Sequence, residues 1–199
     1  MSRLRLLLVV LSMTLASVSA HARLVRPDAQ LQAMHQARDV VIVDVTQVQV
    51  VWARAHFKAH GVAVDDRGPD RLLTLATGRT TDNRVVTFAL LGGAKGDIVQ
   101  RAAGAGHVDV GQRVLVLLGK EGPGGIRRVQ GHGAGIRLIE DGHLFDTEVS
   151  TDDRRRQRLT APKVQDVLAQ WATVSSDATR QAQLQRLLTA TMTSPTEAP

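Results

Sequence analysis

The fold of this chain is decided by three stretches of sequence: RVVTFALLGG at residues 84–93, AAGAGHVDVGQRVLVLLG at 102–119 and GIRRVQGHGAGIRLI at 125–139. Each stretch combines a short run of β-branched and aliphatic residues with glycines inside it or at its ends. Such runs are typical of strands, and a glycine within or beside a strand marks a bulge or tight corner, because the missing Cβ lets the backbone bend. Together they predict a small closed β-barrel.

The remaining strands are expected upstream and between these stretches. Residues 40–52 are mostly β-branched with imperfect alternation, which predicts a long, bent strand. Further strands are expected at 71–80, 84–91 and 112–118, and a last one at 126–139 that glycines 131, 133 and 135 divide. Residues 53–69 and 94–109 read as polar or irregular connections. Five strands fit a mainly β, OB-like Greek-key barrel better than a sandwich, which needs about seven.

Helices are expected on both sides of the barrel. Asp28 can cap a short N-terminal helix in which Leu31, Met34 and Ala37 recur at three-residue steps. This helix ends near Arg38, immediately before the first strand.

The C-terminal segment carries two apolar stripes at helical spacing. The first follows Pro162, a residue favoured in the first turn of a helix, and we expect Trp171 in it to pack against the chain's own barrel. Its members are Val164, Val167, Leu168, Trp171 and Val174. The second, weaker stripe follows Asp177 and either continues the first helix or docks on another protein or a membrane surface. Its members are Leu184, Leu187, Leu188 and Met192.

The glycine pattern resembles that of a scattered family of exported bacterial proteins. The resemblance rests on Gly92-Gly93, on residues 103–118 (AGAGHVDVGQRVLVLL) and on residues 129–138 (VQGHGAGIRL). It implies an OB-like barrel that is distantly similar to the netrin-like and metalloproteinase-inhibitor fold. The matched residues are glycines and core aliphatics, so the resemblance concerns shape rather than activity. Gly106 and Val108 stand where the family carries proline and an aromatic residue, and the cysteines of the netrin-like inhibitors are absent.

The N-terminus has the pattern of a secretory signal peptide. Arg3 and Arg5 precede an uncharged apolar stretch at 6–18, and Ala20 and Ala22 offer small residues for cleavage. The apolar stretch is shorter than the about 20 residues that cross a bilayer, which disfavours the alternative of an uncleaved anchor.

We therefore expect a signal peptide at 1–22, a barrel domain at 23–150, a basic linker with one or two C-terminal helices at 151–192, and a disordered tail at 193–199. The mature protein is expected to be periplasmic or secreted.

Composition excludes several classes of function. The chain has no cysteine, which rules out disulfides, cysteine metal sites and thiol nucleophiles. The net charge of +6 falls to about +4 without Arg3 and Arg5, a modest value for a chain of this size. Aromatic residues make up 3% of the chain, which leaves few stacking platforms for single-stranded nucleic acid, so a nucleic-acid partner is not expected. No later stretch is long and apolar enough for a transmembrane span, and no cofactor motif is present.

Four histidines are the candidates for a metal site. His56 and His60 stand four residues apart, which on a helix places both rings on one face, although no glutamate completes a protease motif. His107 and His132 lie in glycine-flanked turns, and a site would require those turns to converge. Surface or packing roles are the competing interpretation for all four.

Two classes of function remain, and a third is kept as a second alternative. The absence of a nucleophile pattern favours an exported, non-catalytic binding protein for an envelope or extracellular protein, peptide or polymer. A histidine-based metal-binding protein or metal-assisted hydrolase is the alternative, and a protease-inhibitor-like module is the second alternative. The predicted interaction surface combines the second apolar stripe with a basic run that could contact anionic lipid peripherally, or be a solvated linker. Its residues are Arg154, Arg155, Arg156, Arg158, Leu184, Leu187 and Leu188.

Overall fold

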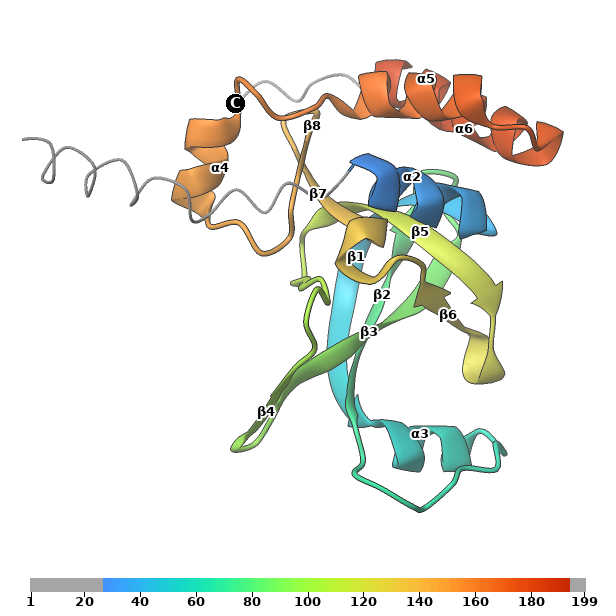
Figure 1. The fold of residues 1–199 in the computed structure, drawn as a ribbon, viewed down its shortest axis with the longest axis vertical. Coiled ribbons are helices and arrows are strands. Elements are labelled where there is room, and N and C mark those ends of the chain that lie inside the picture. The colour runs from blue at the N-terminus through green and yellow to red at the C-terminus, as the bar shows by residue number, and fades with distance from the viewer. Residues whose placement is uncertain (1–26, 194–199) are drawn as a thin grey trace, which may run out of the picture.

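The computed structural model describes residues 27–193, which form a mainly β structure with flanking helices (Figure 1). The described strands are β1 (Asp39–Trp52), β2 (Leu72–Thr80), β3 (Val85–Lys95), β4 (Ile98–Arg101), β5 (Arg113–Glu121), β6 (Ile126–Val129), β7 (Ile136–Glu140) and β8 (His143–Phe145). The helices are α2 (Pro27–Gln36), α3 (Ala53–Ala59), α4 (Thr151–Gln157), α5 (Val164–Val174) and α6 (Ala178–Thr193), with short 3-10 turns η1 (Pro123–Gly125) and η2 (His132–Gly135).

The strands form one sheet in the order β1-β2-β3-β6-β5-β7-β8, and β4 pairs with β3. β1 also pairs with β5, so the pairings among β1, β2, β3, β6 and β5 return to their starting strand. The β3–β6 pair is parallel and the others are antiparallel.

The sequence-based count of five strands was wrong, because residues 27–193 form eight. Residues 130–135 interrupt the expected last strand and divide it into β6 and β7, which both run antiparallel to β5, with Leu118 opposite Val129 and Val116 opposite Ile136. β3 continues through Gly92 and pairs with β4 where an irregular loop was expected. β8 is a short return strand on β7.

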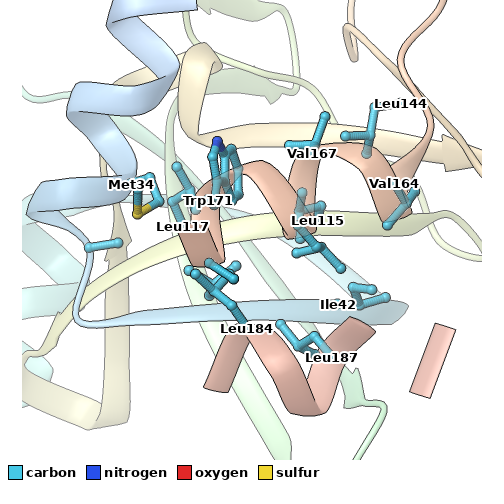
Figure 2. Close-up of a cluster of buried hydrophobic side chains, with 14 of the residues drawn as sticks. Met34, Ile42, Leu115, Leu117, Leu144, Val164, Val167, Trp171, Leu184 and Leu187 are labelled. Atoms are coloured by element: carbon cyan, nitrogen blue, oxygen red, sulfur yellow. The ribbon is translucent and has the colours of Figure 1, made fainter. Parts of the chain in front are cut away.

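Two hydrophobic clusters share β1 and β5. Alternate residues of a strand point to opposite faces, so Val41 and Val43 enter the cluster inside the strand ring, while Val40 and Ile42 enter the cluster beneath the helices. Figure 2 shows this second cluster, in which Trp171 of α5 lies against the sheet. The prediction that the first C-terminal stripe packs on the chain's own sheet is confirmed for Val164, Val167, Leu168 and Trp171, whereas Val174 is exposed.

The helices differ from the predictions at several places. α2 begins at Pro27, so Asp28 belongs to its first turn instead of preceding it. α3 occupies part of the expected polar connection, since its alanines favour a helix. α4 replaces the expected linker because Ser150 accepts a hydrogen bond from the Asp153 N–H at 3.2 Å and caps the helix.

Among the described helices, none has the length and apolar character to cross a membrane.

Candidate functional site

The candidate site is a groove of about 340 Å³ between α3, the sheet and the turn that joins β5 to β6. Leu73 and Leu91 are opposite each other in the β2–β3 pair, and Ala89 is opposite Arg128 in the β3–β6 pair. Phe57 of α3 lines the groove from the β1–β2 connection. α3, which forms one wall of the groove, lies at the opposite end of the sheet from α5 and α6 (Figure 1).

The polar side chains of the groove are all basic. They belong to Arg71, Lys120, Arg128 and His132, and the other lining residues are aliphatic, glycine, proline or Phe57. All four basic residues are exposed, so they form a rim around an apolar floor. Within residues 27–193, none of these four side chains has a hydrogen-bond or ion-pair partner. The groove thus offers apolar surface together with unused hydrogen-bond donors.

Arg127, the neighbour of Arg128, shows how differently two adjacent arginines are placed. Its Nε and Nη2 donate to the Gly119 carbonyl at 3.1 and 2.8 Å, and its Nη1 pairs with the Asp39 carboxylate. Successive residues of a strand point to opposite faces. The Arg127 side chain is therefore bonded to groups of the chain itself, while the Arg128 side chain faces the groove.

His56 of α3 and His60, the residue that caps the C-terminus of this helix, lie side by side, as the four-residue spacing predicts. Their ring centroids are 4.4 Å apart, and the Nδ1 atom of His60 lies 2.8 Å from the His56 carbonyl oxygen. The Nε2 atom of His56 is buried without a hydrogen-bond partner in the described part of the chain. Burial lowers the pKa of His56 below 6.5, and the charge of His60 lowers it further. These surroundings favour the neutral imidazole.

The His60 ring also joins α3 to the β5–β6 turn. Gly124 has a φ of 69°, and a Cβ built on it would lie 2.5 Å from Cδ2 of His60. Glycine is therefore needed at this position both for the backbone conformation and for the close approach of the ring. The contact ties together the two connections that flank the groove.

The turns that carry His107 and His132 meet, but their two rings have different surroundings. The Gly133 N–H donates to the Gly104 carbonyl, which joins the two turns. His132 lies at the edge of the groove, whereas the His107 Nε2 pairs with the Asp109 carboxylate at 3.1 Å on the surface. No group of three or more potential metal-ligating side chains is found over residues 27–193.

The basic run of α4 is matched by carboxylates. Each arginine of the run has an acidic partner within 4.0 Å, and two of these partners lie in the same helix. The pairs are Arg154 with Glu140, Arg155 with Asp152, Arg156 with Asp153 and Arg158 with Asp141. The run is therefore locally neutralised, which reduces the attraction that it would exert on an anionic surface.

The leucines of the predicted interaction surface lie in the core. Leu184 and Leu187 are buried in the cluster beneath α5 and α6, and Leu188 packs against the same cluster. These side chains contact the chain's own sheet and helices instead of forming an exposed surface. The cleavage residues Ala20 and Ala22 lie outside the described residues.

Sequence reasoning did not find the groove. Its basic residues come from the residue before β2, the strands β5 and β6, and the turn after β6, and no local motif joins them. Their unpaired state depends on where the carboxylates lie in the folded chain.

Comparisons with family models, curated proteins and solved structures found no match to this chain.

Proposed function

We propose that this chain is an exported, non-catalytic binding protein that holds its ligand in the groove. The observation that carries the proposal is the apolar floor with unpaired basic side chains around it. A volume of about 340 Å³ falls in the range of ligand pockets, about 300–1,000 Å³. In such a groove the apolar floor removes the apolar part of a ligand from water, and the exposed cations at the rim orient its polar part.

The position of the groove also supports a binding role. OB-like barrels bind ligands on the face of their second and third strands, between the loops that follow strands one and four. The ring β1-β2-β3-β6-β5, with its parallel β3–β6 pair, has the strand order of such a barrel. The groove lies on β2 and β3, between the β1–β2 connection and the β5–β6 turn. We interpret β4, β7 and β8 as additions to this barrel.

The chemistry of the lining supports binding over catalysis. Among the described lining residues there is no serine, threonine or carboxylate that could act as a nucleophile or a general base. His132 has no second group oriented toward it in the described hydrogen-bond network. Binding requires only the apolar and cationic side chains that the lining contains. Hydrolysis would also require a nucleophile hydrogen-bonded to a general base, and the described lining residues form no such pair.

Export is the second part of the proposal and rests on the N-terminal pattern of Arg3, Arg5 and the apolar stretch at 6–18. Intact-mass analysis of the protein recovered from the periplasm or the medium tests this part. We expect an N-terminus at His21 or Arg23. Recovery of the full-length chain from the cytoplasm would contradict it.

Native mass spectrometry tests the groove. The purified protein is incubated with an extract of the producing cells' envelope, and retained mass additions are recorded. Ala89→Phe fills the floor and should abolish the addition, because Ala89 lies in the groove. Ala94→Phe is the matched control, since Ala94 is an exposed residue of the same strand outside the groove. Equal retention by both variants would contradict the proposed site.

A further inference from the structure

We propose that the ligand of the groove is an aliphatic anion, namely an alkyl or acyl chain that ends in one acidic head group. This inference rests on the proposed function and adds the chemistry of the ligand. It follows from which hydrogen-bonding groups the lining contains, from the kind of apolar surface on the floor, and from the place where the cations gather.

The lining supplies donors and almost no acceptors. Arginine and lysine side chains donate hydrogen bonds and accept none, and the described residues of the lining include no carboxylate, carboxamide or hydroxyl side chain. A sugar or an amide would bury donors of its own without a side chain to receive them, which is costly. A carboxylate or a fully ionised phosphate has only acceptors and also compensates the positive charge. The polar end of the ligand is therefore an anion.

The floor is aliphatic. Leu73, Leu91, Ile126 and Val129 line the groove, and among its described lining residues only Phe57 and the exposed His132 carry aromatic rings. Nucleobases and many sugars bind by stacking on several aromatic side chains, which this groove does not provide. An alkyl chain requires only apolar contact and fits a floor of leucine, isoleucine and valine.

Two of the cations lie beside each other on neighbouring strands. The β5–β6 register places Leu118 opposite Val129 and Glu121 opposite Arg127, so Lys120 and Arg128 fall between these two pairs. Neither has an acidic partner within residues 27–193. The head group is placed between Lys120 and Arg128, and the chain extends from there over Ile126 toward Leu91.

Calorimetric titration with three ligands of equal chain length tests the inference. The ligands are decanoate, decyl phosphate and 1-decanol, each used below the concentration at which it aggregates. We expect both anions to bind more tightly than the alcohol, because the alcohol cannot compensate Lys120 and Arg128. Preference for decanoate or decyl phosphate then identifies the head group, and either preference supports the inference.

The double variant Lys120→Gln/Arg128→Gln removes the two head-group cations. Because both are exposed, we expect a loss of about tenfold in anion affinity, with 1-decanol affinity unchanged. Lys95→Gln/Arg101→Gln is the matched control, since it removes the same charges from the exposed β3–β4 hairpin outside the groove. The control should keep wild-type affinity for all three ligands.

Two results separate failure of this inference from failure of the proposed function. If the alcohol binds as tightly as the anions, or if the double variant keeps wild-type anion affinity while Ala89→Phe abolishes binding, the groove binds ligands but the anion inference is overturned. If none of the three ligands binds and the envelope extract also yields no mass addition that Ala89→Phe removes, the proposed function itself is overturned.

Discussion

The His56 ring is held where a positive charge is unfavourable. Its Nε2 atom is buried without a partner, and the His60 ring lies 4.4 Å away between centroids. Because burial and then the charge of His60 lower the pKa of His56 below 6.5, the unfolded chain takes up a proton at a higher pH than the folded chain does. Stability should therefore be unaffected by this group above about pH 6.5 and should fall as the pH drops below it.

Urea unfolding of the wild type and of His56→Gln, at about pH 7.5 and about pH 5, checks this expectation. The loss of unfolding free energy between the two pH values should be smaller in the variant. Carboxyl groups such as Asp66, whose pKa is lowered below 3.8 by a hydrogen bond from Lys58, titrate outside this window. His35→Gln changes an exposed histidine of α2 and serves as the control. An equal pH dependence in both variants and the wild type would contradict the role of His56.

Gly135 is required by close packing in the turn that divides β6 from β7. A Cβ built on Gly135 would lie 1.7 Å from the carbonyl oxygen of Gln130, and this neighbour is backbone that cannot rotate away. Gly135→Ala should destabilise the protein by more than about 2 kcal/mol, because the turn must move. Thermal unfolding measures the effect. Gly122→Ala is the control, since a Cβ there meets only the Ile126 carbonyl oxygen at 3.2 Å, and a comparable loss in both variants would contradict this account.

At the scale of elements, α6 is held by buried leucines. Leu184 of α6 is fully buried in the cluster that contains Trp171 (Figure 2). Leu184→Ala should cost about 2–5 kcal/mol in the free energy of unfolding, since it leaves a cavity in a packed cluster. Leu159→Ala, at a residue 98% exposed, should cost almost nothing and is the control. A near-neutral Leu184→Ala would show that α6 is loosely attached and would restore the docking interpretation of this stripe.

The sequence predicted elements well where local composition decides them. The β-branched run at 40–52 became β1 with its start moved by one residue, and the stripe around Trp171 became α5. The short strands β4 and β8 have few residues to signal them and depend on a partner strand for their hydrogen bonds. The groove was not predicted for a similar reason, because its residues come together only in the folded chain. Arg127 and Arg128 are adjacent and chemically identical, and only the fold places Asp39 beside the first and an open groove beside the second.

At the scale of the whole molecule, the two hydrophobic clusters are coupled through β1 and β5, because alternate residues of each strand belong to different clusters. Residues on both sides of the predicted boundary at residue 150 therefore pack in one hydrophobic cluster, because α5 and α6 share it with β1 and β5. We predict that the sheet and the C-terminal helices unfold together in one transition. The Trp52→Phe variant leaves Trp171 as the fluorescent reporter of the helical layer, while far-ultraviolet circular dichroism reports the whole chain. The two urea transitions should coincide in midpoint and slope, and a fluorescence transition at lower urea would show that α5 and α6 form a separate, weaker unit.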